Sequence, residues 1–331
     1  MRSVLTTAAL CGVLATVAAC SPGPARPAAT PTPAPSASAA AAYQNYVALG
    51  DSFTAGPLIA PQAEGAPLSC VRSGANYPSY LAFYLEVKTF DDASCSGAET
   101  SDLYASQSQR LGLNPRAKTD TPPQFDALTS ATDLVTLGIG GNDFSLFRDV
   151  IGECVRLNGE TSEKAPCRDF FTRDGVDLKM RDAKAIQPRV ESAIAAIGKR
   201  APEARIVVVG YLRILPGKEP TAKLTCTAMP LEAADATWTD SIEREINQSL
   251  RKAADHQGAT FVDAYALSKG HDACAGPKAW VNGAQAIVFR AAAFHPFREG
   301  MDAVARQTYR ILTDKSPPNT PSVDRLARIA R

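Results

Sequence analysis

The 331-residue sequence lacks both a basic tract and a strong net charge. Lys and Arg total 35 and Asp and Glu total 34, so the formal net charge at pH 7 is only +1. The basic residues are scattered along the chain, with no aromatic residues interleaved among them. A nucleic-acid-binding protein needs concentrated positive charge against the phosphates, so we predict no nucleic-acid partner.

The sequence also lacks an apolar run long enough to span a bilayer. Its longest one, Val4 to Ala19, is too short for that and has the form of an export signal behind Arg2. The run ends in Val17-Ala18-Ala19-Cys20, which resembles a bacterial lipobox. We therefore predict residues 1–19 to be a lipoprotein signal peptide and Cys20 to be the lipidated first residue. An ordinary secretory signal, which would leave Cys20 unmodified, is the alternative.

A second segment lacks almost all charge. Residues 20–43 consist mainly of Pro, Ala, Ser and Thr and cannot build a core, so we predict an extended, partly polyproline tether. The chain is then expected to be an exported protein, either secreted or held on the outer face of the membrane by a lipid on Cys20. The folded part is expected to be one domain, residues 44–331, and a monomer.

Histidine is scarce, and no Cys-x-x-Cys motif occurs. The three histidines, His256, His271 and His295, have no metal-like spacing, so we predict no zinc site. Of the eight cysteines, Cys11 and Cys20 lie within the signal region. The other six form an even set in an exported chain, which predicts three disulfides with fifteen possible connectivities. These six are Cys70, Cys95, Cys154, Cys167, Cys226 and Cys274.

Strand and helix patterns alternate along the folded part. Short apolar runs predict strands at residues 46–50, 88–93, 133–138, 205–211 and 260–263, and helical periodicity is found near residues 190–197, 242–250 and 301–312. Continuous apolar strands separated by helices favour a doubly wound parallel sheet covered on both faces. Residues 145–180 and 212–232 do not fit this alternation. We interpret them as loops that shape the substrate site or, equally, as plain disulfide-stapled surface loops.

The most informative motif is Gly50-Asp51-Ser52, which ends the first apolar run and is followed by Gly56. A serine at the carboxyl end of a buried strand points into the crevice where open α/β sheets bind ligands. The motif is not the Gly-x-Ser-x-Gly elbow of the α/β-hydrolases, because position 54 is Thr. Ser52 is therefore a candidate nucleophile, with a plain helix N-cap as the alternative.

Three further blocks lie where predicted strands end and loops begin, or just before a predicted helix. They are Cys95-Ser96-Gly97-Ala98, then Gly140-Gly141-Asn142-Asp143, and finally Phe294-His295-Pro296. A serine nucleophile needs a base, and an oxyanion needs preorganised donors. His295 supplies the base, while the backbone N–H groups of Ser52 and Gly97 and the side-chain amide of Asn142 supply the donors. Asp51 and Asp143 are interpreted as residues that hold the turns rigid.

In this order and spacing the four blocks resemble those of the SGNH (GDSL-type) hydrolases, and most closely the secreted actinobacterial esterase and lipase branch. The resemblance extends from about residue 43 to the C-terminus. It implies a flavodoxin-like three-layer α/β/α sandwich with a central parallel five-stranded sheet, and an acyl-serine mechanism that needs no cofactor. It also implies disulfides that join residues 70 to 95, 154 to 167 and 226 to 274.

One position departs from the family pattern. The family usually has Asp three residues before the histidine, and here that residue is Ala292. We expect the main-chain carbonyl of Ala292 to accept the Nδ1–H of His295 instead, which fixes the tautomer with less charge stabilisation than a carboxylate. The sequence thus predicts a Ser-His dyad.

The predicted function is hydrolysis of carboxylic esters, and the predicted substrate is an acyl lipid or a small acyl ester. Two alternatives stay open at this point. One is a non-catalytic envelope protein that binds lipid or glycan in the same crevice. The other is an enzyme that deacetylates a polysaccharide or transfers an acyl group.

Overall fold

A computed structural model describes residues 43–110, 118–160, 165–217, 226–326 and 329. The predicted signal peptide, Cys20 and nearly all of the predicted tether lie outside the described residues. None of the described helices is long and apolar enough to cross a membrane.

A five-stranded parallel sheet forms the centre of the fold. The strands are β1 (Asn45–Gly50), β2 (Thr89–Asp92), β5 (Leu134–Gly138), β8 (Arg205–Val209) and β9 (Thr260–Val262), and their order is β2-β1-β5-β8-β9. All neighbouring strands are parallel. Numbered within this sheet alone, the order is 2-1-3-4-5, that of flavodoxin-like folds. All five predicted strands are therefore confirmed.

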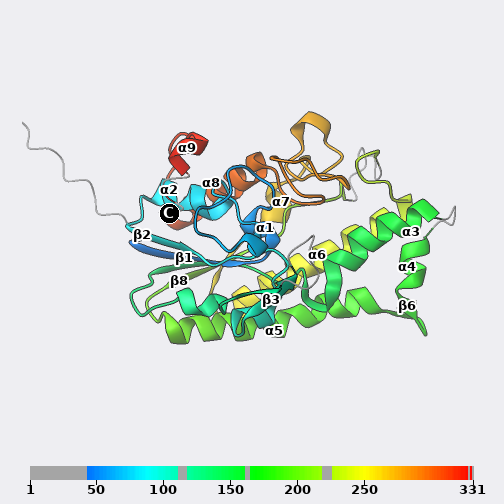
Figure 1. Cartoon of the computed structure of the whole chain (residues 1–331). Coiled ribbons are helices and arrows are strands. Elements are labelled where there is room, and N and C mark those ends of the chain that lie inside the picture. The colour runs from blue at the N-terminus through cyan, green and yellow to red at the C-terminus, as the bar shows by residue number, and fades with distance from the viewer. Residues whose placement is uncertain (1–42, 111–117, 161–164, 218–225, 327–328, 330–331) are drawn as a thin grey trace, which may run out of the picture. The chain divides into compact units, whose positions relative to one another are not determined.

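Helices cover both faces of the sheet, as Figure 1 shows. The helices α2 (Tyr77–Leu85) and α8 (Arg298–Thr313) pack together on one face, and α5 (Leu178–Arg200) and α6 (Ala233–His256) pack together on the other. Each of the three predicted helical segments lies within one of these elements. The predicted three-layer α/β/α architecture is thus confirmed.

Burial follows the sequence pattern closely. All residues of β5 are buried and all but the first of β1, whereas the edge strand β2, with its sequence Thr-Phe-Asp-Asp, is partly exposed. In α6, Ile242, Ile246 and Leu250 recur every four residues and are fully buried against the sheet. Apolar residues therefore place the core between the central strands and the helix pairs.

Smaller elements complete the described fold. The antiparallel hairpins are β3–β4 and β6–β7, and the short helices are α1, α3, α4, α7 and α9, together with the 3₁₀ turns η1 to η4 and η6 and the π-helical turn η5. Their bounds are β3 Gln107–Arg110, β4 Lys118–Thr121, β6 Thr172–Arg173, β7 Val176–Asp177, α1 Ser52–Ala55, α3 Cys154–Glu160, α4 Pro166–Phe170, α7 Ala264–Leu267, α9 Val323–Leu326, η1 Leu68–Cys70, η2 Thr100–Leu103, η3 Gln124–Ala127, η4 Asp143–Ser145, η5 Arg148–Glu153 and η6 Gly276–Lys278.

The two regions that broke the alternation are not simple loops. Residues 145–180 contain η5, α3, α4 and the hairpin β6–β7, so the description of this region as a loop was wrong. In Figure 1, α3, α4 and β6 lie beside one end of α6, away from α1. In the described part of 212–232, the apolar residues Leu212, Ile214, Leu215 and Leu231 are buried in the core.

The disulfide pairing implied by the family resemblance is confirmed. Cys70 is bonded to Cys95, Cys154 to Cys167 and Cys226 to Cys274, with Cα atoms 4.3, 5.1 and 5.6 Å apart. The first bond ties the end of η1 to the loop after β2, and the second joins the starts of α3 and α4.

Candidate active site

Ser52 is the first residue of α1 and follows β1 after a single residue. The N-cap is Asp51, whose Oδ1 accepts a hydrogen bond from the backbone N–H of Phe53 at 2.9 Å, so the alternative reading of Ser52 as an N-cap was wrong. The turn needs glycine at position 50. A Cβ atom there would lie 2.2 Å from Thr54 Oγ1 and 2.6 Å from the carbonyl oxygen of Gly138. The close approach of β1 and β5 thus fixes the position of the backbone that carries Ser52.

The second block is held beside the first by three contacts. Cys95 is bonded to Cys70 and donates its N–H to the carbonyl of Gly50, while Ser96 donates its N–H to the carbonyl of Cys70. Gly97 has φ +78°, in the left-handed region that a side chain disfavours. The backbone of this loop is therefore anchored directly to the strand that carries Ser52.

Asn142 follows β5, the strand next to β1. Its side-chain Nδ2 donates to the carbonyl of Ala98 at 3.0 Å, which places the amide against the loop that carries Gly97. One of the two N–H bonds of this amide is thus used for orientation. The structure brings together two of the predicted donor positions, Gly97 and Asn142, although 45 residues separate them in the sequence.

Asp143 reinforces the same junction. This fully buried carboxylate accepts hydrogen bonds from the Thr100 N–H at 3.0 Å and hydroxyl at 2.6 Å, and it pairs with Arg189 of α5 at 2.7 Å. The Arg189 guanidinium also lies 4.2 Å from the centre of the Phe144 ring. The structure agrees with the interpretation of Asp143 as a residue that holds a turn.

Asp51 is connected to the third block through a residue that sequence reasoning missed. The Tyr211 hydroxyl donates to Asp51 Oδ2 at 2.5 Å and accepts from the Gly141 N–H at 2.7 Å. Burial raises the pKa of Asp51 to about 7, against the opposing effects of the hydrogen bonds from Tyr211 and Phe53. Tyr211 follows β8, so the structure links the ends of three adjacent strands.

His295 lies beside the turn that carries Ser52, and Phe289, six residues before it, accepts a backbone hydrogen bond from Ala60. Its ring centre is 5.4 Å from that of Phe53, the residue after Ser52. Burial lowers the pKa of His295, and the hydrogen bond to a backbone carbonyl partly opposes this. Burial therefore favours the neutral imidazole that a general base requires.

The carbonyl that holds His295 is not the predicted one. Nδ1 lies 2.6 Å from the carbonyl oxygen of Ala293, so the expectation for Ala292 was wrong by one residue. The carbonyl of Ala292 instead accepts from Asn282 Nδ2 at 3.0 Å and from the His295 N–H at 3.3 Å. The turn that carries the histidine therefore directs the Ala292 carbonyl away from the ring.

Within the described part of the chain, no hydrogen bond joins the Ser52 hydroxyl to the His295 ring. Hydrogen bonds between catalytic groups are often long before substrate binds and shorten in the complex. The His295 ring instead packs against Phe53, the residue after Ser52.

Comparisons with known proteins agree with this geometry. The model of the GDSL-like lipase/acylhydrolase family matches residues 48–303. The chain is 37% identical to Lipase 2 of Streptomyces coelicolor over 235 residues, which are 70% of this chain and 74% of that protein. It is 32% identical to an esterase of Streptomyces scabiei, with 72% and 74% covered.

The chain belongs to the GDSL-like lipase/acylhydrolase family. Its fold agrees with the crystal structure of phospholipase A1 from Streptomyces albidoflavus, at a TM-score of 0.61 and 28% identity, with 83% of this chain and 100% of that one covered. The extracellular lipase of Streptomyces rimosus gives a TM-score of 0.60 at 25% identity, with 82% and 99% covered. As a member of this family, the chain is an enzyme of the carboxylic ester hydrolase class.

Within this family fold, aromatic rings surround the site. Phe53 packs against Phe147 and Tyr211 at centroid distances of 5.6 and 5.1 Å, and Phe147 contacts Tyr211 at 4.8 Å. A Cβ atom on Gly141 would lie 2.4 Å from the Phe147 ring, so only glycine fits there. Sequence patterns gave no signal for this cluster, because Tyr211 and Phe147 lie outside the four blocks.

The other two histidines lie elsewhere. His256 ends α6 and contacts Glu191 at 2.8 Å, with 60% of its side chain exposed. His271 stacks on Trp280 with ring centres 3.8 Å apart. Among the described residues, no group of three or more His, Cys, Asp or Glu side chains could hold a metal ion.

Proposed function

We propose that the chain is an exported serine esterase that hydrolyses acyl esters through an acyl-Ser52 intermediate, with His295 as its base. The observation that supports this proposal is the packing of the His295 ring against Phe53, the residue after Ser52, at the carboxyl ends of β1 and β5, with Asn142 in the loop after β5. In a sheet of this order that position is the topological switch point, where α/β proteins bind ligands.

The proposed reaction has two halves. His295 Nε2 accepts the Ser52 proton as the oxygen attacks the ester carbon, and the resulting oxyanion accepts hydrogen bonds from the donors of Ser52, Gly97 and Asn142. The imidazolium then gives its proton to the departing alcohol. Water repeats these steps on the acyl-enzyme and releases the acid, so no cofactor is needed in this scheme.

The Ala293 carbonyl takes the place of an orienting carboxylate in this proposal. It accepts the Nδ1–H, which leaves Nε2 unprotonated toward the serine. A neutral carbonyl stabilises the imidazolium less than an aspartate would, so the proposal is a dyad. No Asp→Asn substitution is then expected to lower kcat as much as His295→Ala without unfolding the protein.

The deciding experiment compares Ser52→Ala with the parent chain on p-nitrophenyl acyl esters. We expect loss of turnover with a nearly unchanged Tm, and labelling by a fluorophosphonate probe in the parent only. Unchanged turnover in Ser52→Ala would refute the nucleophile. A parent chain that neither reacts with the probe nor hydrolyses any ester would instead favour the non-catalytic binding protein.

The substrate is proposed to be an acyl lipid or a small acyl ester. The names of the relatives include lipases, an esterase and a phospholipase A1, which all act on acyl esters. Acyl esters of two to sixteen carbons, assayed beside acetylated sugars, would separate a lipase from a polysaccharide deacetylase. Added acceptor alcohols would reveal acyl transfer by a change from free acid to new ester.

Membrane attachment through Cys20 also stays a proposal. Metabolic labelling with a fatty acid, compared between the parent and Cys20→Ser, would test it. Loss of label in the variant supports the anchor, and an unlabelled parent found in the medium supports a secreted protein.

A further inference from the structure

A short apolar turn projects from the loop that leads to His295. Residues 285–290, Gln-Ala-Ile-Val-Phe-Arg, are all exposed. Ile287, Val288 and Phe289 have exposed fractions of 40%, 65% and 77%. Consecutive exposed apolar side chains of this size are unusual on the surface of a soluble protein and mark an interaction site.

The turn is well formed. The Ile287 carbonyl accepts hydrogen bonds from the N–H groups of Arg290 and Ala291 at 2.9 and 3.0 Å, and the Ile287 N–H donates to the Ala291 carbonyl at 2.9 Å. Val288 and Phe289 are therefore held at the tip of a closed turn. Phe289 has φ +65°, a conformation that suits Gly or Asn and disfavours a bulky side chain.

Neither the backbone nor the core explains phenylalanine at this position. The side chain is mostly exposed, and its backbone conformation carries a steric penalty. A residue that is unfavourable in both respects points to a requirement outside folding.

The base of the turn is tied to both catalytic segments. The buried Asn282 side chain donates to the carbonyls of Gln285 and Ala292 at 2.7 and 3.0 Å, and the Asn282 N–H donates to the His295 carbonyl at 2.9 Å. On the other side, Ala292 donates its N–H to the carbonyl of Pro57, in the segment that follows α1. Whatever holds the tip therefore also holds the segments that carry Ser52 and His295.

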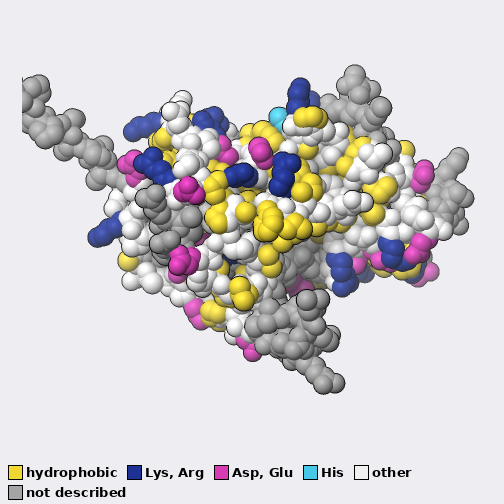
Figure 2. Space-filling model, turned by 45° about the horizontal axis from the view of Figure 1, so that its top comes forward, with side chains coloured by type: hydrophobic (Ala, Val, Ile, Leu, Met, Phe, Trp, Pro, Cys, Tyr) yellow, Lys and Arg dark blue, Asp and Glu magenta, His cyan; other side chains and the backbone are white. Residues whose placement is uncertain are grey.

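Positive charge flanks the apolar tip. Arg290 and Arg298 are exposed, with the Arg290 guanidinium 4.9 Å from the Phe297 ring, and Glu299 is the exposed acidic neighbour. Figure 2 shows one face of the molecule, on which hydrophobic side chains gather with both basic and acidic side chains beside them. Apolar side chains next to guanidinium groups match the boundary between the acyl chains and phosphates of a lipid surface.

We infer that the apolar tip, Ala286 to Phe289, inserts into a lipid surface and holds the segments that carry Ser52 and His295 there. A tip of four side chains is far smaller than the roughly 800 Å² per partner of a stable protein interface. A lipid surface needs no complementary pocket, so a few inserted side chains suffice. The inference deepens the proposed function, but the binding step itself does not depend on catalysis.

The first test measures binding without turnover. Full-length chains carrying Cys20→Ser and Ser52→Ala are sedimented with phosphatidylcholine vesicles, with and without phosphatidylglycerol. Adding Val288→Ser and Phe289→Asn should lower the partition coefficient at least tenfold, since transfer of a buried Val and Phe is lost. Asn suits the positive φ at 289, so Tm should not fall.

The matched control is Phe170→Ser with Val176→Ser, which removes a Phe and a Val that are 46% and 49% exposed beside α4. This control should bind within twofold of its parent. All chains share residues 1–43, so any contribution from that segment is common to them.

A second readout reports the tip alone. Val288→Trp should be quenched by brominated phosphatidylcholine beyond the level of the parent, which has two tryptophans, while Val176→Trp should not. Equal partition of the tip variant and its parent together with an unquenched Trp at 288 would overturn the inference. A vesicle-free parent that sediments as a dimer, and becomes a monomer on changing 288 and 289, would also overturn it in favour of a second copy.

The activity arm separates this inference from the proposed function. On a water-soluble short-chain ester, the tip variant with Ser52 intact should equal the parent, whereas on vesicle lipid its rate should fall about tenfold. A parent inactive on every ester would refute the proposed function and leave the binding result standing. Equal rates of both chains on vesicle lipid would refute the role of the tip alone.

Discussion

Two of the disulfides in this molecule lie in different surroundings. Cys70–Cys95 lies in the loops at the carboxyl ends of β1 and β2, next to Ser96 and Gly97. Cys154–Cys167 lies in what we call the helical arm, residues 148–160 and 165–177, which contains η5, α3, α4 and the hairpin β6–β7.

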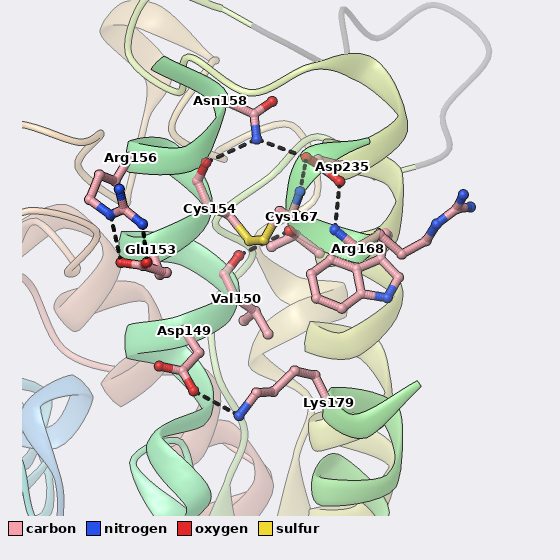
Figure 3. Close-up of a disulfide and its surroundings, with 12 residues drawn as sticks. Asp149, Val150, Glu153, Cys154, Arg156, Asn158, Cys167, Arg168, Lys179 and Asp235 are labelled. Atoms are coloured by element: carbon pink, nitrogen blue, oxygen red, sulfur yellow. Dashed lines mark hydrogen bonds and ion pairs between the residues drawn. A yellow bond between two sulfur atoms is a disulfide. The ribbon is translucent and has the colours of Figure 1, made fainter. Parts of the chain in front are cut away.

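Figure 3 shows how the helical arm is held together. Asp235 of α6 is fully buried and accepts hydrogen bonds from the N–H groups of Cys167 and Arg168, both at 3.0 Å, and from Asn158 Nδ2 at 2.8 Å. Lys179 pairs with Asp149 at 2.7 Å. In the part of the chain that the structure describes, none of these polar groups makes a hydrogen bond to Ser52, Gly97, Asn142 or His295.

The loops around Cys70–Cys95 are different, because a backbone hydrogen bond from Cys95 to Gly50 connects the loop that carries Gly97 to the end of β1. The comparison shows that the disulfides of this chain do not share one structural role. The bond Cys70–Cys95 connects the loop that carries Gly97 to the end of η1, and the bond Cys154–Cys167 closes a local helical unit beside α6.

The largest expected contrast is between two asparagines that make the same kind of bond. Asn142 donates Nδ2 to the Ala98 carbonyl at 3.0 Å, and Asn158 donates Nδ2 to the Cys154 carbonyl at 2.9 Å. We expect Asn142→Ala to lower kcat by about 10²–10³, because an oxyanion donor is lost. Single-turnover kinetics on a p-nitrophenyl ester would measure this.

Asn158→Ala is the matched control in the helical arm. It should reduce the free energy of unfolding by about 1–3 kcal/mol, since Asp235 and Cys154 lose a buried partner, with kcat per folded molecule unchanged. Equal effects of both variants on kcat would contradict the division between the two regions.

A second contrast removes each disulfide. Replacing Cys70 and Cys95 by Ser should lower both kcat and stability, because the loop carrying Gly97 loses its anchor. Replacing Cys154 and Cys167 by Ser should lower stability alone. The bonded cysteines are 25 and 13 residues apart in the sequence. In the chain-entropy model each disulfide stabilises the folded state by on the order of 3 kcal/mol.

Urea unfolding and steady-state kinetics on the same preparations would test this pair of variants. The two should lose similar unfolding free energy and differ in kcat. An intact kcat after loss of Cys70–Cys95 would show that the other contacts of Ser96 are sufficient to hold the loop.

Tyr211→Phe tests the link between the strand ends. It leaves the Gly141 N–H and the Asp51 carboxylate without their shared hydroxyl, at a cost of about 1–3 kcal/mol. The hydrogen bond from Tyr211 also opposes the rise in the pKa of Asp51, so this pKa should increase further from about 7. Urea unfolding of the parent and the variant across pH 5–9 would measure both effects.

The sign of the pH effect follows from protonation. Folding raises the pKa of Asp51 above its value of 3.8 in the unfolded chain, so the stability it contributes is present at low pH. This stability is lost as the pH rises through about 7, and in the variant the loss continues to higher pH. Parallel stability profiles of the two chains would contradict the assignment.

The smallest expected effect concerns His295. Burial lowers its pKa below the ordinary 6.5, so the acid limb of kcat/KM should have its midpoint below 6.5. A lowered folded pKa also means that stability falls as the pH drops below 6.5, where the unfolded histidine gains its proton first. A midpoint above 6.5 would require an acidic partner at the ring that the described residues do not provide.

Much of the fold could be predicted because it depends on short-range patterns. The five apolar strands and the helical repeats in α5, α6 and α8 follow from periodicity alone, and the order of the four blocks identified the family. The helical arm was missed because its helices are short and polar, and packing against α6 stabilises them more than their own sequence pattern does. The roles of the site residues stay predictions until the variants are measured.

The sequence by itself determined which chemical groups are available: one serine after a buried strand, one histidine near the end, and an even set of six cysteines in the folded part. Only the tertiary structure decided how they are held. The Ala293 carbonyl holds the imidazole because the turn directs the Ala292 carbonyl to Asn282. Tyr211 joins Asp51 to Gly141 because β1, β5 and β8 are neighbours in the sheet. Such contacts depend on how backbone segments far apart in the sequence are oriented in the fold. No local sequence pattern specifies this orientation.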